Sequence, residues 1–490
     1  MLPHRLRWSG KSRRLSYAAA AALAALALGA TASAAYAGNV NIVRQGEPPA
    51  KYPPNTHYYK TIQAAVNAST AGDYVLIEPG TYDEAVKITS AQSGIWVRGM
   101  NRNTVIVDGQ NKPGNGIEIY KASDVWVENM TVRNFDEGPG CPDEECGNEI
   151  WWNGGANSGK IGAHGWYGSY LTAYDTGLNG GYGIFTNNET EGSWDNIYAS
   201  GFNDSGMYLG ACQECDARIT RATMENNSLG YSGSNSGGKL AIESSLFRDN
   251  STGVLPNSET FDAPPPQDGE CGRENIEDPN PTPTITSTKI ARCTVIRYNV
   301  ITENNNSTVP VNNSTEGAAF GNGIILPSTY ADLFEKNIIS NNEKTGLFGV
   351  EYPFPFPPGA GTIFFQLAGN KISKNVFLHN GYQGGMYTGD VTLVSGASEI
   401  FLGTESQSTN NCLSGNVFTG ATFPAKIQGT WGCQNETTPS PGGGLPAYEY
   451  IGAAAEEAAI LRKPAPQPAP PPQQSMPNPC RGVPKNPLCR

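Results

Sequence analysis

Residues 337–342, NIISNN, show the pattern that decides the fold: two asparagines five residues apart enclose large apolar side chains. The pattern recurs at residues 129–134 (NMTVRN), 299–304 (NVITEN) and 375–380 (NVFLHN). Glycines recur with it at steps of 23, 24, 23 and again 23 residues, namely Gly183, Gly206, Gly230 and Gly253, then Gly323 and Gly346. Such a period predicts a solenoid, because one coil is too small to bury its apolar face alone.

The runs between these corners predict strands. Residues 240–242 (LAI), 300–301 (VI) and 376–378 (VFL) are short and rich in β-branched or bulky side chains, which favours strands over helices. Three short strands and three turns fit into about 23 residues at roughly 3.3 Å per residue. We therefore expect an all-β coil whose equivalent strands pair in parallel.

The corner residues predict how neighbouring coils are held together. Asparagines at equivalent corners can stack, with each side-chain amide bonding the next. Asn203, Asn227 and Asn250 each precede a periodic glycine by three residues. We expect that glycine to supply a positive φ at the turn.

A short helix is predicted to cap the amino-terminal end of the stack. Thr61 is a candidate N-cap for residues 61–66 (TIQAAV), and the strand 74–77 (YVLI) follows. Together with PGTYDEAV at residues 79–86, this resembles the opening of the right-handed parallel β-helix (pectin lyase-like) superfamily. The resemblance covers about residues 58–435 and implies a single-stranded right-handed parallel β-helix.

The resemblance leaves the activity open. GTYDEAV also fits the first signature of pectin methylesterases, but the later blocks QDTL, DFIFG and LGRPW are absent from the sequence. The polygalacturonase set is also absent, apart from His164-Gly165. Residues 206–215 (GMYLGACQEC) and 230–233 (GYSG) most resemble exported actinobacterial β-helix repeat proteins without an assigned reaction.

The first 37 residues are typical of a cleavable secretory signal, with five basic residues, an alanine-leucine core and AYA before Gly38. The core is shorter than the ~20 residues of a membrane span, so we expect a secreted or envelope-associated chain without a transmembrane span. Ser12-Arg13-Arg14 leaves twin-arginine export open. After removal of the signal, 28 Lys and Arg face 45 Asp and Glu, a net charge of −17, which argues against a nucleic-acid partner.

We expect four regions: a signal peptide (1–37), an amino-terminal arm (38–59), the β-helix (60–435) and a proline-rich tail (436–490). The tail composition is typical of a disordered, extended spacer, and a short alanine-rich helix is expected near residues 453–461. The ten cysteines fall into neighbouring pairs that predict disulfides: Cys141 with Cys146, Cys212 with Cys215, Cys271 with Cys293, Cys412 with Cys433, and Cys480 with Cys489. For Cys212 and Cys215, half a zinc site or a redox pair is the alternative.

Insertions and aromatic residues mark a candidate groove. Insertions after Pro256 and Val350 leave the coil at the same phase, so their loops are expected to wall one side of a groove. Aromatic faces in a cleft can hold sugar rings, although single rings also fill coil interiors. The candidate substrate-binding residues are Trp151, Trp152, Trp166, Tyr167, Tyr170 and Tyr174.

The catalytic candidates are His164, Asp175 and Asp204. His164 could move the proton next to a uronate carboxylate, and two of Asp175, Asp195 and Asp204 could serve as a hydrolytic carboxylate pair. The first insertion is rich in acidic side chains, which makes calcium a candidate ligand, with a solvated acidic loop as the alternative; these residues are Asp136, Glu137, Asp143, Glu144, Glu145 and Glu149.

The sequence therefore predicts an exported β-helix protein that engages polysaccharide or cell-envelope glycan along a lateral groove. As an enzyme it would be a polysaccharide lyase or epimerase rather than a hydrolase. The alternative is a non-catalytic envelope, adhesion or carbohydrate-binding module. The oligomeric state does not follow from the sequence.

Overall fold

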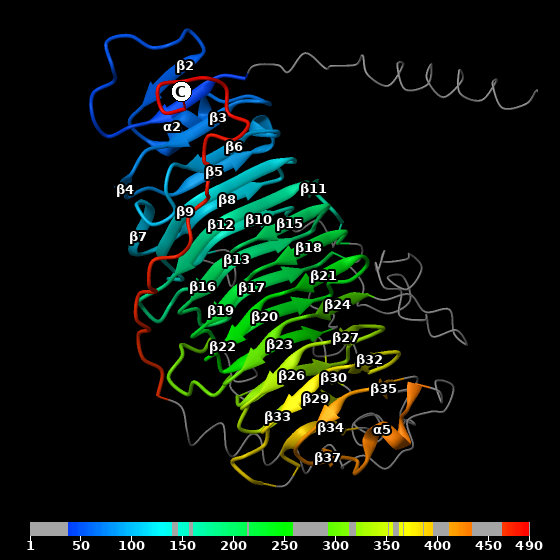
Figure 1. Cartoon of the computed structure of the whole chain (residues 1–490). Helices are drawn as coiled ribbons and strands as arrows, with labels where there is room; N and C mark the ends of the chain where they lie inside the picture. The colour runs from blue at the N-terminus through cyan, green and yellow to red at the C-terminus, as the bar shows by residue number, and fades with distance from the viewer. Residues whose placement is uncertain are drawn as a thin grey trace, which may run out of the picture. The chain divides into compact units, whose positions relative to one another are not determined.

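The chain folds into a right-handed parallel β-helix, as the sequence predicts (Figure 1). This computed structural model describes residues 38–139, 146–155, 160–212, 215–257, 293–312, 320–350, 352–355, 362–365, 367–385, 387–394, 411–433 and 463–489. The predicted signal peptide and the alanine-rich helix near 453–461 lie outside the described residues. Each coil has three sides. One side belongs to an 11-stranded sheet B, and the other two sides belong to a bent 22-stranded sheet A.

Sheet B contributes one strand to each coil. Its strands are β5 (Val86–Thr89), β8 (Asn115–Tyr120), β10 (Asn148–Asn153), β13 (Tyr182–Asn187), β17 (Ser205–Gly210), β20 (Leu229–Ser234), β23 (Thr252–Asn257), β26 (Asn322–Pro327), β29 (Thr345–Val350), β34 (Gly389–Val394) and β37 (Thr422–Phe423). All pair in parallel with equivalent strands of the neighbouring coils.

Sheet A contributes two successive strands to most coils, and β9 (Val125–Asp136) and β12 (Trp166–Tyr174) span both sides. The first side also holds β1 (Val40–Val43), β2 (Thr56–Tyr59), β3 (Tyr74–Ile77), β6 (Trp96–Gly99), β15 (Gly192–Asp195), β18 (Ala217–Thr220), β21 (Leu240–Glu243), β24 (Thr294–Arg297), β27 (Leu333–Glu335), β32 (Lys371–Ser373) and β35 (Cys412–Ser414). The second side also holds β4 (Gly80–Tyr82), β7 (Val105–Pro113), β16 (Tyr198–Ser200), β19 (Thr223–Glu225), β22 (Leu246–Arg248), β25 (Val300–Thr302), β28 (Ile338–Ser340), β33 (Val376–Leu378) and β36 (Val417–Phe418).

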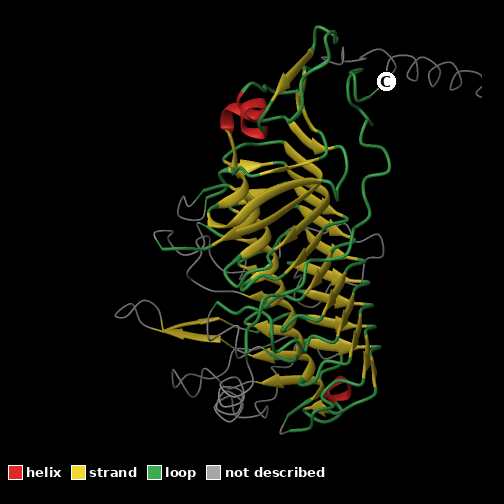
Figure 2. Ribbon diagram, turned by 90° about the vertical axis from the view of Figure 1, so that its left-hand side faces the viewer, coloured by secondary structure: helices red, strands yellow, loops and turns green. Residues whose placement is uncertain are grey.

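Smaller elements decorate this stack. They are α2 (Ile62–Asn67), η1 (Ser90–Gln92), β11 (Ala163–His164), β14 (Glu189–Thr190), β30 (Tyr352–Pro355), β31 (Thr362–Phe365) and α5 (Ile427–Thr430). The antiparallel hairpin β30–β31 follows β29 and projects away from the coils (Figure 2). The other insertion of the same phase follows β23, and residues 258–292 lie outside the described residues. None of the described helices is long and apolar enough to cross a membrane.

The predicted asparagine ladder runs through the corner between sheet A and sheet B. Asn227 donates its side-chain amide to Asn250 at 3.0 Å, and Asn250 donates to Asn304 at 3.0 Å. Asn304 continues to Asn342 at 3.1 Å, and Asn342 to Asn380 at 2.9 Å. A buried amide without a partner costs roughly 1–3 kcal/mol, so the ladder fixes the register of the coils.

A second ladder runs through the bend of sheet A. Asn299 donates to Asn337 at 3.2 Å, Asn337 to Asn375 at 2.9 Å, and Asn375 to Asn416 at 3.1 Å. Three of the four paired-asparagine motifs therefore place one amide in each ladder. This explains the constant spacing of five residues, because one short strand separates the two corners.

Two ladder assignments were wrong. In the motif of residues 129–134, both asparagines adopt a positive φ and lie outside the ladders, with Asn134 accepting hydrogen bonds from Thr176. Asn203 also lies outside, because Phe202 takes the ladder position and donates its backbone N–H to Asn227.

The reason for the periodic glycines was also wrong, although their register is confirmed. Gly206, Gly230 and Gly253 occupy equivalent positions of β17, β20 and β23, and none of them has a positive φ. A Cβ added at Gly230 would lie 2.5 Å from the carbonyl oxygen of Gly253 and 2.9 Å from the ladder amide of Asn250. Glycine is required because the next coil approaches too closely for a side chain.

As predicted, the helix α2 closes the amino-terminal end. Its N-cap residue Thr61 accepts a hydrogen bond from the Ala64 backbone N–H. The helix buries Ile62, Ala65 and Val66. The stretch expected to be an arm, residues 38–59, supplies β1 and β2, which extend sheet A beyond β3.

The carboxyl-terminal tail differs from the expected disordered spacer. Residues 463–489 lie beside the coils (Figure 1), and the end of this segment packs on β1 and β3. Asn103 and the backbone of Gln473 exchange two hydrogen bonds of 2.8 Å, and Arg98 donates to the carbonyl groups of Pro479 and Arg481. The composition of the tail does not allow the tail to form a core of its own. Its backbone groups instead form hydrogen bonds with residues more than 350 positions away in the chain.

Three of the predicted disulfides are present: Cys212–Cys215, Cys412–Cys433 and Cys480–Cys489. Cys146 and Cys293 are disulfide-bonded as well, and the partners that the sequence predicts for them, Cys141 and Cys271, lie outside the described residues. The disulfide at Cys212 and Cys215 argues against a zinc site there.

Replacing a periodic glycine tests the close approach of the coils. We expect Gly230→Ala to lower the free energy of unfolding by about 1–3 kcal/mol, because the added methyl group meets backbone that cannot move independently. Gly429→Ala is the control, since a Cβ there meets no atom within 4 Å. Chemical denaturation measures both, and equal stability of the two variants would contradict the explanation.

Candidate functional site

The predicted aromatic cluster is divided between the core and two outer faces. Trp152 and Trp166 are fully buried and pack on Trp194, with ring centroids 5.8 and 4.8 Å away. These two side chains fill the coil interior. They therefore cannot present a ring face to a polymer bound outside the coil.

Trp151 lies on the outer face of sheet B. It stacks on Phe185 with centroids 5.0 Å apart, and its indole N–H donates to Asn187 Oδ1 at 2.9 Å. With Tyr182 and Tyr208 these rings form a cluster in which no member is more than 7% exposed. The ring of Trp151 is thus covered in this structure.

Tyr167 and Tyr174 lie on the outer faces of sheet A. Tyr167 ends a column of half-buried stacked rings, Tyr74, Trp96, Trp126 and Tyr167, with centroids 4.3–4.9 Å apart. The hydroxyl of Tyr174 accepts a hydrogen bond from Arg133 at 2.6 Å. Tyr170 adopts a positive φ of 52° at the bend of β12.

The three catalytic candidates do not form one constellation. His164 precedes β12 and Asp175 follows it, so they lie at opposite ends of a nine-residue strand. His164 is exposed, with Nδ1 3.9 Å from Asp124 Oδ1. Asp175 is buried and accepts hydrogen bonds from the backbone N–H groups of Gly177 and Gly180, which is the pattern of a turn-stabilising carboxylate.

Asp204 is buried and has two hydroxyl partners. It accepts hydrogen bonds from Tyr182 at 3.0 Å and from Ser205 at 2.5 Å. Its carboxylate is therefore engaged in the local structure rather than directed at an open surface.

Two buried carboxyl groups of the acidic insertion lie near Asp175. Glu149 is completely buried, and burial together with the charge of Asp175 raises its pKa well above the usual range. Burial, and then Asp175, raise the pKa of Asp136 to about 6. In the described part of the chain no group of three or more His, Cys, Asp or Glu side chains is arranged to hold a metal ion; Asp143, Glu144 and Glu145 lie outside it.

This acidic cluster predicts a pH-dependent stability. The pKa of Asp136 is about 6 in the folded chain against 3.8 ordinarily, so folding takes up a proton between these values and stability falls as pH rises through them. We expect Asp136→Asn to melt at a higher temperature than the wild type at pH 8, with a smaller difference at pH 4. Melting curves of both proteins and of the exposed control Asp83→Asn test this; a difference independent of pH would contradict it.

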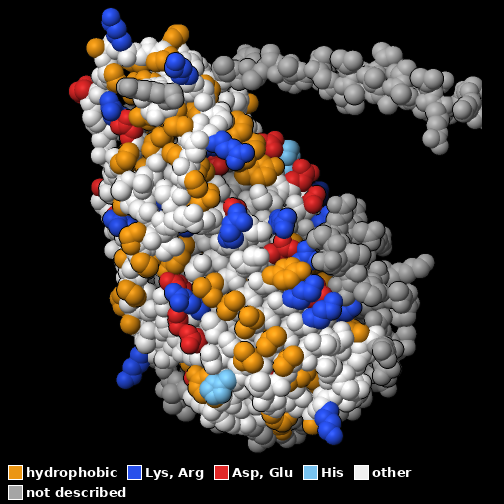
Figure 3. Space-filling model, viewed as in Figure 1, with side chains coloured by type: hydrophobic (Ala, Val, Ile, Leu, Met, Phe, Trp, Pro, Cys, Tyr) orange, Lys and Arg blue, Asp and Glu red, His pale blue; other side chains and the backbone are white. Residues whose placement is uncertain are grey.

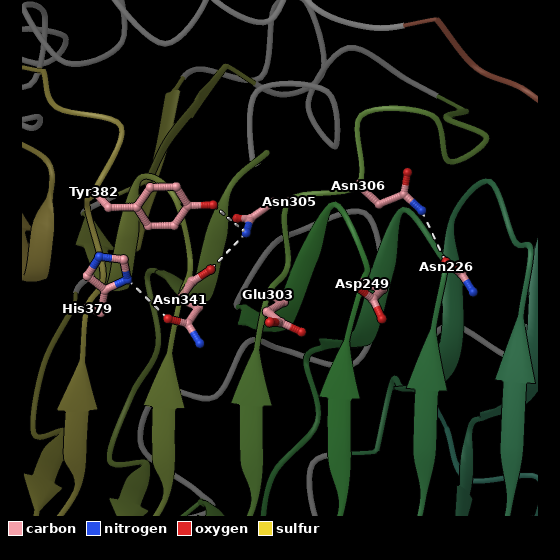
Figure 4. A pocket seen from close by; sticks show the side chains of 8 residues that line it. All are labelled: Asn226, Asp249, Glu303, Asn305, Asn306, Asn341, His379 and Tyr382. Carbon is pink, nitrogen blue, oxygen red and sulfur yellow. Dashed lines mark hydrogen bonds between the residues drawn. The ribbon is translucent and has the colours of Figure 1, made fainter.

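A pocket of about 490 Å³ lies on the outer side of the corner that holds the ladder from Asn227 to Asn380, and is called the corner pocket below. Five of its lining residues are equivalent residues of consecutive coils, and each directly precedes a ladder asparagine and has a positive φ of 54–60°. These are Asn226, Asp249, Glu303, Asn341 and His379. Figure 4 shows them in one row above the ends of the second strands of sheet A.

Loops that follow the ladder complete the pocket with Asn305, Asn306 and Tyr382. His379 stacks on Tyr382, with ring centroids 5.2 Å apart, and its Nδ1 lies 3.1 Å from Asn341 Oδ1. Asn305 donates to the hydroxyl of Tyr382 at 3.1 Å, and Asn306 donates to Asn226 Oδ1 at 3.1 Å (Figure 4). The walls are thus held by amide hydrogen bonds.

The two carboxylates of the pocket lie side by side. The backbone N–H of Asp249 donates to the carbonyl group of Glu303 at 3.2 Å, which places the two residues on adjacent coils, about 4.8 Å apart. Neither side chain accepts a hydrogen bond from the described residues, and Asp249 has only Arg248 at 3.8 Å. Burial raises the pKa of Asp249; Arg248 opposes this shift, and Glu303 adds to it.

This pocket was not predicted from the sequence. His379 lies next to the corner asparagine Asn380 in the sequence. The five residues of the row share one sequence feature, because each directly precedes a ladder asparagine. This signal can be used only when it is known which asparagines form the ladder. The residue before a ladder asparagine has a left-handed backbone conformation, which turns its side chain outward while the asparagine points inward. The register of five coils is then needed to bring these side chains together.

No protein-family model matches the chain, and no curated protein matches it. Among solved structures, it is similar to the A-module of Azotobacter vinelandii mannuronan C-5 epimerase AlgE4, with 13% identity, coverage of 72% of this chain and 82% of that chain, and a TM-score of 0.39. A mannuronic acid specific polysaccharide family 6 lyase from the human gut microbiota shows 13% identity, 73% and 76% coverage, and a TM-score of 0.42.

A rhamnogalacturonan lyase shows 14% identity, coverage of 76% of this chain and 87% of that chain, and a TM-score of 0.44. At these identities the likeness concerns the fold alone.

Proposed function

We propose that this chain is an exported protein that binds polysaccharide in the corner pocket. The observation that carries the proposal is the convergence of Asp249, Glu303 and the Tyr382–His379 pair in one polar hollow. Carboxylates without donors can accept hydrogen bonds from sugar hydroxyl groups, and a ring face can contact the apolar side of a sugar. The volume falls within the range of about 300–1,000 Å³ typical of ligand pockets.

The charge of the pocket favours a hydroxyl-rich, uncharged stretch of glycan. Two carboxylates line the pocket, and no lysine or arginine is among its lining residues. A uronate would be repelled by both carboxylates. The predicted lyase or epimerase activity, which acts on uronates, stays a prediction that this pocket does not favour.

The surface charges agree with this choice of ligand. The whole chain carries a net charge of −12, and Lys and Arg side chains on the face shown in Figure 3 are interspersed with Asp and Glu. On the described part of that face, acidic side chains interrupt the basic ones, which disfavours a polyanion. Nucleic acids are therefore poor candidates for binding there.

Tyr382 provides a test of the sugar contact. We expect Tyr382→Ala to weaken retention on a bound polysaccharide by about 1–3 kcal/mol, through loss of ring contact and of the hydrogen bond from Asn305. Tyr52→Ala is the matched control, because both tyrosines are 48% exposed. Affinity electrophoresis in mannan, xylan, β-glucan and dextran measures retention, and equal retention of the two variants would sink the proposed contact.

A second candidate function is glycoside hydrolysis at the same pocket. Retaining glycosidases use two carboxyl groups about 5–5.5 Å apart, one protonated and one ionised. Asp249 and Glu303 occupy adjacent coils, and the raised pKa of Asp249 suits the acid. His164 and Asp175, at opposite ends of β12, offer no such pairing.

Asp249→Asn separates binding from hydrolysis. If the pair is catalytic, we expect this variant to lose about 10²- to 10⁴-fold in turnover while retention on the same four polysaccharides changes little. Asp216→Asn, at an exposed position directly before β18, serves as the control. Reducing-end release is measured, and a wild type that releases no product from any polysaccharide it retains rules out hydrolysis of these polymers.

A further inference from the structure

The docked tail reaches the wall of the pocket. Gln467 is only 6% exposed, and its side-chain amide donates to the carbonyl groups of Thr308 and Ala465, both at 2.9 Å. Its Oε1 accepts from Asn306 Nδ2 at 3.4 Å. Asn306 lines the pocket and donates to Asn226, a neighbouring residue of the same lining, so the same amide group joins the tail to the pocket.

The loop that carries Asn306 is held from both sides. Its backbone N–H donates to the carbonyl group of Asn250 at 3.1 Å, and its Oδ1 accepts from the backbone and hydroxyl of Thr308. The carbonyl group of Thr308 in turn accepts from the Ala465 backbone N–H at 2.8 Å. Without the tail, this carbonyl group would lose the two partners that the tail provides.

The far end of the tail is anchored on the amino-terminal coils. Met476 donates its backbone N–H to Asn129 Oδ1 at 2.7 Å, and Ser475 donates to the same oxygen at 2.9 Å. Arg102 donates to the carbonyl group of Gln474 at 3.1 Å. Beyond these contacts, Cys489 packs in an apolar cluster with Val40, Ile42 and Leu76.

We propose that the carboxyl-terminal segment 463–489 completes the binding pocket, with Gln467 as a positioning residue that holds Asn306 and its loop. The segment acts as a strap: its distal contacts fix it to the first coils, and its proximal contacts fix the pocket wall. This inference rests on the proposed function, since it assigns a role to the tail in the same site.

The test compares two glutamines of the tail. Gln467→Met keeps the length of the buried side chain and removes its hydrogen bonds, whereas Gln474→Met changes an exposed side chain. We expect Gln467→Met to accelerate hydrogen exchange of the Thr308 backbone amide about fivefold and to weaken retention on mannan, xylan, β-glucan or dextran by a similar factor. Gln474→Met should match the wild type in both measurements.

The two readouts distinguish the two claims. Faster exchange at Thr308 with unchanged retention overturns the role of the strap in binding, and unchanged exchange overturns its hold on the loop. If the wild type is retained on none of the four polysaccharides, the proposed function fails. Exchange at Thr308 then decides alone whether the strap positions the wall.

A change at the distal anchor provides a second test in the full chain. Met476→Pro removes the N–H that bonds Asn129, and Gln474→Pro removes an N–H without a hydrogen-bond partner among the described residues. If the strap docks as one unit, Met476→Pro accelerates exchange at Thr308 and Gln474→Pro does not. Equal exchange at Thr308 in these two variants overturns cooperative docking.

Discussion

Everything in this β-helix depends on how closely successive coils approach at one corner. The backbone of one coil lies so near the next that a side chain at Gly230, Gly253 or Gly323 would overlap the next coil. The ladder asparagines occupy the space beside these glycines, and Asn227, Asn250, Asn304 and Asn342 are all fully buried. Each amide is satisfied only if the next coil is in register, so close packing and polar satisfaction impose the same geometry.

The same constraint shapes the pocket. Directly before each ladder asparagine the chain adopts a left-handed conformation, which turns one side chain per coil to the outside while the asparagine points inward. The outward residue has no role in the ladder, so its chemistry is free to differ from coil to coil. Consecutive coils thus set Asp249 beside Glu303 at a spacing fixed by the parallel strands, and the scaffold determines where the functional groups lie.

Features that repeat along the sequence could be predicted from it. Features that depend on where a residue lies in three dimensions could not. The period, the parallel strands, the cap at Thr61 and the paired cysteines follow from local patterns. Trp151 and Trp152 show why the prediction of an aromatic surface was wrong. Neighbouring residues of a strand point to opposite faces, so aromatic residues that are close in the sequence do not all lie on one surface. The tail is another example, because its proline-rich composition says nothing of partners such as Asn103 and Arg98.

The acidic residues separate into structural and functional groups by the donors around them. Asp175 accepts backbone N–H groups from its own turn, and Asp204 accepts two hydroxyl groups, so both carboxylates are already satisfied within the fold. Asp249 and Glu303 border an open hollow and accept no hydrogen bond from the described residues. A carboxylate that the fold leaves unsatisfied retains hydrogen-bonding capacity for a ligand. For this reason the corner pocket, rather than the aromatic segment around Asp175, is the better place for sugar recognition.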